Sequence, residues 1–566
     1  MNGAQHILDA FHRHNIHTVF GYPGGCIMPL YDALVDDVGV EHVLCRHEQA
    51  CALAADGFAR ASGRLGVCIA TSGPGATNLI TGVANAYMDS VPLLVITGQV
   101  ASGMIGTDAF QETDILGMTL GIVKHSYLAD SAEALPGIIE EAINLAREGR
   151  PGPVWIDIPK DILLSEIASP APASQPQPAQ PRPDISEALA MLRSARQPLI
   201  YSGGGVSLAG AEDSFRNFAG TSGIPGVVTL KGIGNAGRHN PGNLGMLGMH
   251  GSRAANKAVD ECDLLLVIGA RLDDRATGQL DGFAPNARMI HIDADAAEIN
   301  KLRPADLGLR GDLKAILSAF TKALEQQPLA IEDWQARCRT WHTTAGFKAA
   351  DNEEPLAPIT GPAFIRQLSR IAPDNTVVAC DVGQHQMWVA QHYEFDHPRH
   401  HLTSGGLGTM GFGLPAAIGA QFADRDSTVI NVTGDGSFMM NAQELATIRR
   451  YNLPLKLIIL DNQCLGMVRQ QQELFYNNRE SHINLDDNPD FVAMARAFDI
   501  PALHIERTDQ IRRGIETILA YRGPMLLHVT IRRDENVWPI VKPGASNRDM
   551  IDEPRRKNTA NKEHAA

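Results

Sequence analysis

The chain lacks the features that mark nucleic-acid-binding and membrane proteins. Its 49 Lys and Arg residues are outnumbered by 64 Asp and Glu residues, which gives a formal net charge of −15. Nucleic acid or an anionic membrane would require a basic surface field, so neither is an expected partner. The apolar runs, such as 92–97 and 264–269, are also far shorter than the roughly 20 residues that span a bilayer.

Disulfide and targeting signals are missing as well. The eight cysteines form no C-x-x-C pair and are scattered through apolar stretches, which favours buried free thiols over a zinc site or a disulfide framework. The first 20 residues carry His6, Asp9, His12 and Arg13 among their apolar residues, so they form no signal-peptide core. We therefore expect a soluble, cytoplasmic protein.

The chain does have length and a regular alternation of segments. Its 566 residues require about two to four domains. Short apolar runs such as GVCIAT at 66–71, LLLVIGA at 264–270 and LKLIILDN at 455–462 alternate with Ala-rich helical stretches. That alternation is typical of parallel sheets covered by crossover helices. The predicted fold class is α/β, with three doubly wound parallel-sheet domains.

Two breaks in composition divide the chain. The Pro-rich run 168–183 cannot pack a core and is interpreted as an extended linker. The polar stretch 326–359, which runs into the sequence EEPLAPITGP, is interpreted as a second junction. The predicted domains are 1–167, 184–325 and 360–541, followed by a C-terminal tail at 542–566.

The strongest local signal lies in the third domain. The apolar strand TVINVT runs into Gly434, Asp435, Gly436 and Ser437, and a second strand ends just before Asn462. Ligands of doubly wound sheets bind beyond the carboxyl ends of strands, so Asp435 and Asn462 should approach one another. Their oxygens suit Mg²⁺, and the glycines allow a diphosphate to approach backbone amides. The GDG turn alone would be an ordinary strand-to-helix connection, but the matched second strand favours a magnesium–diphosphate site.

In the first domain, Glu48 stands where a strand turns into a helix of small residues. A Glu in the first turn of a helix is often only a charge that complements the helix dipole. Here Cys51, Ala52, Ala54 and Ala55 would make its surroundings apolar, which could hold a carboxyl partly protonated. Both interpretations are compatible with the residue types.

Six segments resemble the catalytic subunit of acetohydroxyacid synthases (acetolactate synthases), and the bacterial isozyme II type in particular. The GDG-to-Asn spacing is similar to the metal–diphosphate motif of thiamine-diphosphate enzymes in general. The segments are FGYPGG at 20–25, GTDAFQE at 106–112, GRPGPVWIDIPKD at 149–161, DVGQHQMW at 381–388, SGGLGTMGFGLPAAIGA at 404–420 and NVWPIVKPGASN at 536–547. The resemblance implies a pyrimidine-binding, a central FAD-binding and a diphosphate-binding domain, in that order.

The resemblance also implies a reaction and a coenzyme site. Pyruvate would be decarboxylated on thiamine diphosphate, and the two-carbon unit would be joined to a second pyruvate or to 2-ketobutyrate, which opens branched-chain amino acid biosynthesis. Glu48 would hydrogen-bond the aminopyrimidine ring and promote proton loss from the thiazolium. Asp435, Asn462 and the main-chain carbonyl of Cys464 would bind Mg²⁺. The other implied contacts of thiamine diphosphate are Pro74, Asn78, Val382, Gly383, Gln384, His385, Gly408, Met410, Gly436, Ser437, Leu465, Gly466, Met467 and Val468.

Four residues of the first domain are implied to form the reaction centre and the substrate channel. Gly25 would lie at the reaction centre, while Phe110, Gln111 and Lys160 would line the channel. By residue type alone, Phe110 would be assigned to the core and Lys160 to the surface. Their functional interpretation therefore rests on the resemblance.

The middle domain has glycines after several predicted strands, although no G-x-G-x-x-G follows the strand PLI. Any one of them would by default belong to a turn. Together they resemble the FAD-binding segments of the family, whose flavin is structural and is not turned over. The implied FAD contacts are Arg150, Gly203, Gly204, Gly205, Thr229, Leu230, Met249, His250, Gly251, Gly269, Ala270, Arg271, Arg275, Asp293, Gly311 and Asp312. Arg275 is also implied to receive the carboxylate of the second substrate.

One substitution departs from the family pattern. After GMVRQ the family generally has a tryptophan that helps to select 2-ketobutyrate, whereas this chain has Gln471. Losing apolar contact to one methyl group changes discrimination by about 1–3 kcal/mol, so a weaker preference for 2-ketobutyrate is expected. The resemblance further implies a homodimer or homotetramer with active sites between subunits, and a small regulatory subunit.

Three other interpretations of the sequence stay open. A pyruvate oxidase, or another thiamine-diphosphate-dependent 2-keto acid decarboxylase or carboligase, would use a similar site. A catabolic acetolactate synthase would lack the flavin. An inactive scaffold that retains cofactor binding belongs to a different class, and the intact Glu48, Asp435 and Asn462 argue against it.

Overall fold

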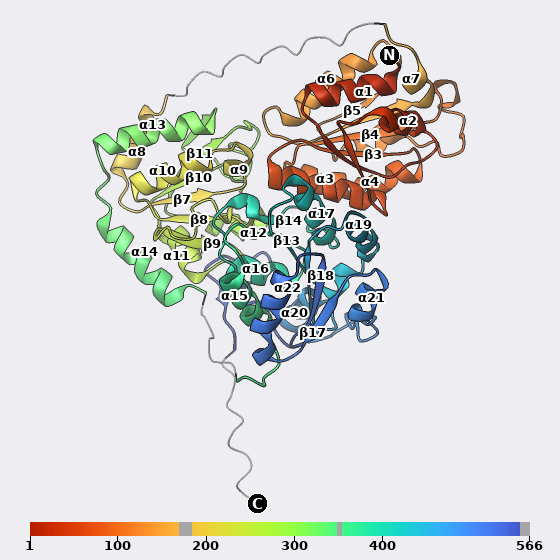
Figure 1. Cartoon of the computed structure of the whole chain (residues 1–566). Coiled ribbons are helices and arrows are strands. Elements are labelled where there is room, and N and C mark those ends of the chain that lie inside the picture. The colour runs from red at the N-terminus through yellow and green to blue at the C-terminus, as the bar shows by residue number, and fades with distance from the viewer. Residues whose placement is uncertain (169–183, 348–353, 555–566) are drawn as a thin grey trace, which may run out of the picture.

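The protein is described by a computed structural model that covers residues 1–168, 184–347 and 354–554. Along the chain it contains three six-stranded sheets, and every strand pairing within them is parallel (Figure 1). This confirms the predicted fold class. Residues 169–183 of the predicted linker lie outside the described part of the chain.

The first sheet lies between two layers of helices. Its strands are β1 (Thr18–Gly21), β2 (Glu41–Leu44), β3 (Gly66–Ala70), β4 (Leu93–Gln99), β5 (His125–Leu128) and β6 (Pro153–Pro159). The helices are α1 (Gly3–Arg13), α2 (Met28–Asp36), α3 (Glu48–Ser62), α4 (Pro74–Met88), η1 (Ser102–Met104), α5 (Ile115–Thr119), α6 (Leu135–Arg147) and α7 (Lys160–Leu164). The strand order is β2-β1-β3-β4-β6-β5, with α1, α2, α6 and α7 on one face and α3 and α4 on the other (Figure 1).

The middle sheet has the order β12-β11-β10-β7-β8-β9, so the winding reverses between β7 and β10. Its strands are β7 (Pro198–Ser202), β8 (Gly226–Val228), β9 (Asn243–Met246), β10 (Leu264–Ile268), β11 (Arg288–Asp293) and β12 (Leu307–Arg310). The helices are α8 (Ser186–Ser194), α9 (Gly205–Leu208), α10 (Glu212–Ser222), η2 (Leu230–Gly232), α11 (Arg253–Glu261), α12 (Asp274–Thr277), η3 (Leu280–Gly282), α13 (Leu313–Gln326) and α14 (Glu332–Ala345).

The third sheet has the order β14-β13-β15-β16-β18-β17. Its strands are β13 (Val377–Cys380), β14 (His401–Thr403), β15 (Val429–Gly434), β16 (Lys456–Asp461), β17 (Ala502–Ile505) and β18 (Met525–Thr530). The helices are α15 (Gly361–Ile371), α16 (Gln384–His392), η4 (Pro398–His400), α17 (Gly413–Ala423), α18 (Asp435–Phe438), η5 (Ala442–Glu444), α19 (Leu445–Tyr451), α20 (Gly466–Phe475), α21 (Phe491–Ala497), η6 (Thr508–Gln510) and α22 (Ile511–Ala520). A short antiparallel pair, β19 (Ile540–Val541) and β20 (Met550–Ile551), follows.

Helices α3 and α17 join the first and third domains. Gly57 lies against the main chain of Ala416, and Gly419 against that of Ala54, so closely that a Cβ atom on either glycine would overlap the opposite backbone. One buried cluster combines apolar residues of both domains around this helix pair. The small residues of α3 are thus explained by direct backbone contact between two helices.

Two segments interpreted above as a junction and a tail carry regular structure. Helix α14 lies within 326–359, and its Trp334 is buried in the middle-domain core with the indole N–H donating to Pro198 O at 2.8 Å. Beyond residue 541 the chain returns to the middle domain, where β20 pairs with β19 and Val541 N donates to Met249 O at 2.9 Å. Only two side chains of α14, Trp334 and Cys338, are buried. Most of its residues are polar because they face solvent, and for that reason its sequence resembles that of a linker.

Membrane spans and disulfides can be assessed for the described ranges. None of the helices there combines the length and the apolar character needed to cross a bilayer. All eight cysteines are free thiols; seven of them are buried, as predicted, and Cys26 is partly exposed.

Candidate active site

The predicted magnesium ligands follow neighbouring strands of the third sheet. Strands β15 and β16 pair in parallel, so Asp435 and Asn462 leave the sheet at the same edge. Asn462 Nδ2 donates to Gln384 Oε1 at 3.3 Å, and Asn462 Oδ1 accepts from the main-chain N of Cys464 at 3.2 Å. The amide oxygen is therefore directed toward the turn that carries the third predicted ligand.

Asp435 is a buried carboxylate with one fixed oxygen. Its Oδ2 accepts a hydrogen bond from Asn488 Nδ2 at 2.8 Å. Burial, and then the charge of Asp461, raise the pKa of Asp435 to about 7. A divalent cation would offset both effects because it favours the ionised carboxylate. Asn488 was not anticipated, since the polar run 484–490 around it is typical of a surface loop.

The same edge leaves space for a phosphate group beside two glycines. A Cβ atom on Gly436 would lie 2.9 Å from Leu465 Cδ2, and one on Gly466 would overlap the side chain of Gln384, so larger residues would fill the edge. His385 is buried, and its Nε2 has no hydrogen-bond partner among the described residues. Burial lowers the pKa of His385 to about 3, so its ring is neutral; its single N–H donates to the main-chain carbonyl of Asp381, which leaves Nε2 as an acceptor. These features fit a diphosphate held through Mg²⁺.

A second buried carboxylate, Asp381, holds the loop that carries Gly408 and Met410. Its Oδ1 accepts from Gly411 N at 2.9 Å, and its Oδ2 accepts from Gly413 N at 3.0 Å. Burial raises the pKa of Asp381 to about 6. Nothing in the run DVGQHQMW singles out this residue, because its partners lie some thirty residues away in the chain.

Val382, Gly383 and Ser437 lie at the same edge. Ser437 Oγ donates to Val382 O at 2.9 Å, which connects the start of α18 to the turn after β13. Gly383 then caps the start of α16. These predicted contacts are brought together by the sheet.

Helix α20 carries Gln471, the residue predicted to affect the choice of the second substrate. Val468 and Gln471 are exposed one turn apart, whereas Gln470 between them is buried. Gln470 is fixed by three hydrogen bonds. Its side chain donates to Val537 O and accepts from Val537 N, both at 2.9 Å, and it also accepts from Gln384 Nε2 at 3.1 Å. The outward direction of Gln471 is therefore set by its anchored neighbour. Met467 is half-buried at the start of the helix.

In the first domain Glu48 is the first residue of α3. Asn78 Nδ2 donates to Glu48 Oε2 at 3.0 Å, and a Cβ atom on Gly75 would lie 3.6 Å from Glu48 Oε1. Helix α4 begins at Pro74, so Asn78 lies in its second turn. Two motifs that were identified separately thus form one site.

The other predicted residues of this domain follow further strands at the same edge. Gly25 follows β1 and is exposed, and Lys160 begins α7 after β6 and is also exposed. Phe110 follows β4 and is 87% exposed. A Cβ atom on Gly73 would lie 2.9 Å from Gln111 O, so Gln111 adjoins the start of α4.

The two halves of this constellation are not joined within one chain. Among the described residues, no hydrogen bond or ion pair connects Glu48 with Asp435, Asn462 or His385. The start of α3 instead contacts the third domain through Arg46 N, which donates to Glu444 Oε1 at 2.9 Å.

The glycines of the middle domain make two turns that touch. Gly203 N donates to Ile268 O at 3.0 Å and Gly205 N to Gly269 O at 2.9 Å, and a Cβ atom on Gly203 or Gly205 would overlap the backbone at 269–270. These turns follow β7 and β10, the strands between which the winding of the sheet reverses. Crevices at such reversal points are the usual ligand sites of doubly wound sheets.

The remaining predicted flavin contacts also follow strands of this sheet, with one exception. Arg150 comes from the first domain, and its Nη1 lies 2.7 Å from Glu298 Oε1. The carbonyl of Arg271 accepts from Tyr201 Oη at 2.9 Å, and its guanidinium makes no hydrogen bond or ion pair within the described part of the chain, although its charge favours the ionised form of Asp273. Asp312, in contrast, caps the N-terminus of α13, because its side chain accepts from Lys314 N at 2.9 Å. This capping role explains an aspartate at this position without any contact to a flavin.

Several of the predicted flavin contacts also interact with neighbouring residues of the middle domain. Thr229 Oγ1 caps η2, and Met249 N donates to Arg275 O at 2.8 Å. Burial raises the pKa of Asp293 to about 6, and burial lowers the pKa of His250 to about 4. Leu230, Gly251, Ala270 and Gly311 contribute backbone to the same edge.

Comparison with known proteins matches the three domains in order. The N-terminal TPP binding domain of thiamine pyrophosphate enzymes matches residues 1–118, the central domain 185–320, and the C-terminal TPP binding domain 381–529. The acetolactate synthase isozyme 2 large subunit of Escherichia coli K12 is 53% identical over 98% of this chain and 100% of its own length. The chain belongs to the acetolactate synthase large-subunit family. A probable acetolactate synthase large subunit of Methanocaldococcus jannaschii is 43% identical over 97% of this chain and 95% of its own length.

As a member of this family, the protein is a thiamine-diphosphate-dependent enzyme, which confirms the resemblance. Within the described ranges no group of three or more His, Cys, Asp or Glu side chains is arranged to hold a metal ion. The predicted magnesium site differs from such clusters, because it would use one carboxylate, one amide oxygen and one main-chain carbonyl. Water and phosphate oxygens usually complete the coordination of Mg²⁺.

Proposed function

We propose that this acetolactate synthase family member decarboxylates pyruvate and joins the two-carbon unit to a second 2-keto acid. A second pyruvate yields 2-acetolactate and CO₂, and 2-ketobutyrate yields 2-aceto-2-hydroxybutyrate and CO₂. The observation that carries the proposal is the Glu48–Asn78 pair together with the strand-end ligands Asp435 and Asn462, in a chain similar to its relatives over nearly its whole length. The proposed setting is cytoplasmic branched-chain amino acid biosynthesis.

Each half of the site has a separate task in this proposal. Thiamine diphosphate, when bound, supplies the reactive carbon centre. Glu48 shares a proton with the pyrimidine ring, and Asn78 keeps its carboxylate in place. Asp435, Asn462 and the carbonyl of Cys464 would hold Mg²⁺, which would bind the diphosphate.

We assign FAD, in a structural role, to the carboxyl edge of the middle sheet. The touching glycine turns at 203–205 and 269–270 lie at the reversal point of the sheet, where a dinucleotide can approach backbone amides. The unpaired guanidinium of Arg271 suits a phosphate or another anionic group. Arg275 is 63% exposed in its side chain, in keeping with its proposed contact with the second substrate.

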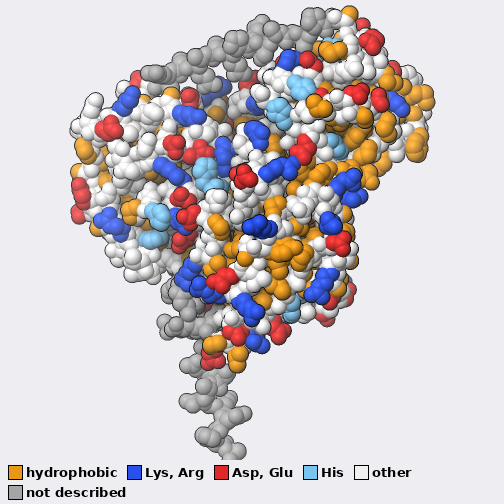
Figure 2. Space-filling view, in the orientation of Figure 1, with side chains coloured by type: hydrophobic (Ala, Val, Ile, Leu, Met, Phe, Trp, Pro, Cys, Tyr) orange, Lys and Arg blue, Asp and Glu red, His pale blue; other side chains and the backbone are white. Residues whose placement is uncertain are grey.

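The proposed assembly is a homodimer or homotetramer that completes each active site across an interface. Support comes from exposed apolar side chains of the first and third domains, such as Phe110 and Met440. Figure 2 shows apolar side chains gathered over the first and third domains on the face in view. A small regulatory subunit is a further proposed partner, because relatives are named as large subunits. Domains 1–167, 184–325 and 360–541 are our proposed division.

Product analysis tests the proposed function. Purified protein is incubated with pyruvate, with and without 2-ketobutyrate, in the presence of thiamine diphosphate, Mg²⁺ and FAD, and the products are identified. Acetolactate is expected. In Glu48→Gln, carboligation should fall by about 10²–10⁴-fold with the fold retained, because proton transfer is lost. Glu187→Gln, which alters an exposed glutamate in the first turn of α8, is the matched control and should retain activity. Full activity of Glu48→Gln would exclude the proton-transfer role.

Anaerobic mixing with pyruvate separates the proposal from a pyruvate oxidase. The flavin spectrum should stay oxidised while acetolactate accumulates. Rapid bleaching would support the oxidase, and a colourless purified protein that carboligates without FAD would support the catabolic type of synthase.

A further inference from the structure

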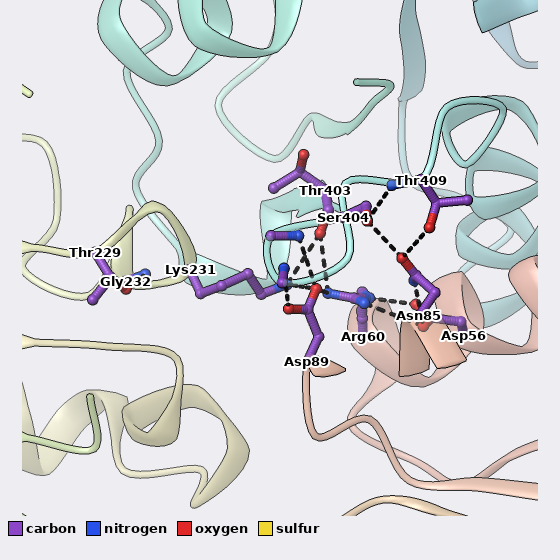
Figure 3. Close-up of polar contacts among 12 residues, drawn as sticks. Asp56, Arg60, Asn85, Asp89, Thr229, Lys231, Gly232, Thr403, Ser404 and Thr409 are labelled. Atoms are coloured by element: carbon purple, nitrogen blue, oxygen red, sulfur yellow. Dashed lines mark hydrogen bonds and ion pairs between the residues drawn. The ribbon is translucent and has the colours of Figure 1, made fainter. Parts of the chain in front are cut away.

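A buried cluster of charged side chains lies where the three domains meet (Figure 3). Arg60 from α3 pairs with Asp56 through Nε and with Asp89 through Nη1, the latter at 2.9 Å. Lys231 from η2 of the middle domain lies 3.6 Å from the same Asp89 carboxylate. Side-chain exposure is 0% for Asp56, 1% for Asp89 and 6% for Arg60, against 25% for Lys231. The cluster therefore contains two carboxylates and two cations whose charges neutralise one another, and three of the four side chains are almost fully buried.

This cluster holds the segment that leads into the predicted thiamine-diphosphate loop, residues 404–410. Asp89 accepts from Gly405 N at 3.0 Å and from Gly406 N at 2.8 Å. The carbonyl of Thr403 accepts from Arg60 at 3.1 Å and from Lys231 at 3.3 Å. Three consecutive peptide units of the third domain are thus fixed by side chains of the other two domains.

Asn85 fixes the far end of the same loop. It donates to Asp56 at 3.1 Å, and its Oδ1 accepts from Ser404 Oγ at 2.6 Å and from Thr409 Oγ1 at 3.0 Å. Thr409 stands between Gly408 and Met410, the residues predicted to contact the coenzyme. The geometry of the loop therefore depends on groups outside the third domain.

Lys231 is the contribution of the middle domain to this arrangement. Its segment follows β8 at the sheet edge proposed for the flavin, and a Cβ atom on Gly204 would lie 3.1 Å from Lys231 Cβ. On the other side, a Cβ atom on Gly405 would lie 2.8 Å from Lys231 Cδ, so the lysine stem is packed against the loop. One side chain thus touches both the glycine turn of the middle domain and the loop of the third. Burial, and then the charge of Arg60, lower the pKa of Lys231 to about 8.

We propose that Lys231 is a positioning residue that couples occupancy of the flavin site to the affinity for thiamine diphosphate. The proposal rests on the proposed FAD site. A dinucleotide bound against Gly204 would restrict the segment 229–232, and Lys231 would then hold Thr403 O and Asp89 in the geometry that the loop 404–410 requires. Linkage makes the effect reciprocal, so thiamine diphosphate must tighten FAD by the same factor.

Titration calorimetry tests the coupling in the full-length protein. Thiamine diphosphate is titrated in the presence of Mg²⁺ into flavin-free and into FAD-loaded protein, and FAD binding is followed separately by its fluorescence. In the wild type, FAD should lower the Kd of thiamine diphosphate by about 5-fold or more. Lys231→Met retains an apolar stem without the charge and should reduce that factor to below about 2-fold. Lys231→Arg retains the charge and should preserve much of the coupling.

The controls separate coupling from a structural role. Lys322→Met changes an exposed lysine of α13 in the same domain and should leave the factor at its wild-type value. If Lys231→Met does not fold, Lys231→Gln replaces it. A lysine with only a structural role would lower the melting temperature and leave the ratio of the two Kd values unchanged, which would overturn the proposal. Equal affinities with and without FAD in the wild type would overturn it directly, while absence of FAD binding would overturn the flavin assignment as well.

Discussion

Helices α3 and α17 are in direct backbone contact at Gly419, so adding one methyl group there should strongly lower the stability of the fold. In Gly419→Ala the new carbon would overlap Ala54 O and lie 2.7 Å from Phe58 N. Normal contact with the oxygen would require the helices to separate by about 1.5 Å. Overpacking of a rigid core costs about 1–3 kcal/mol. Because the neighbour here is helix backbone, which cannot rotate away, we expect the upper part of that range.

The same displacement should reach the coenzyme loop, since α17 begins three residues after Met410. Differential scanning calorimetry of the apoprotein should show a melting temperature lower by several degrees, and titration should show weaker binding of thiamine diphosphate. Gly220→Ala is the matched control, because its Cβ atom would meet nothing within 4 Å in helix α10. It should stabilise the protein by about 0.5–1 kcal/mol. If Gly419→Ala melted at or above the wild-type temperature while this control behaved as expected, the reasoning from backbone contact would be wrong.

Three further substitutions test the site and its surroundings. Asp435→Asn should weaken binding of thiamine diphosphate with Mg²⁺ by about 100-fold or more, while the apoprotein at pH 8 should be no less stable, because a buried carboxylate is removed; near-wild-type affinity in calorimetry would contradict the ligand assignment. Burial raises the pKa of Asp157 to about 7, above the unfolded value of about 3.9, so its contribution to the free energy of unfolding should fall from pH 4 to pH 7 by up to about 1.4 kcal/mol per unit. Urea unfolding of Asp157→Asn should show a flatter pH profile, and an unchanged slope would refute this. Gln471→Trp should raise the preference for 2-ketobutyrate over pyruvate by about 10-fold or more in a competition assay, and an unchanged product ratio would exclude the proposed apolar contact.

The residues that could be found from sequence share a simple position. Asp435 and Asn462 each directly follow an apolar strand of the third sheet, and parallel strands bring their carboxyl ends to one edge. Glu48 stands a few residues beyond β2 of the first sheet. The same logic predicted the three sheets. The relation of Glu48 to Asn78 does not follow from residue types, because it depends on how α3 packs against α4.

The charged cluster could not be predicted, for a different physical reason. Arg60, Asp89 and Lys231 lie in three segments that are far apart in the chain, and pairing between distant side chains leaves no periodic pattern in a sequence. The burial of Trp334 could not be predicted either, because most residues next to it in the sequence are polar. Local patterns therefore located the site, but not the long-range contacts that position it.

The shared core around α3 and α17 limits how this protein can be taken apart. Apolar side chains of the first and third domains form one cluster there, whereas the buried residues of the main middle-domain cluster all lie between 188 and 338, with α14 included. Among the described residues, Val228, Ile233 and Met246 of the middle domain pack into the third-domain core. In a chimaera with a relative, the middle segment could be exchanged as a cassette, provided that residue 231 still meets Asp89. The outer two segments would have to be inherited together.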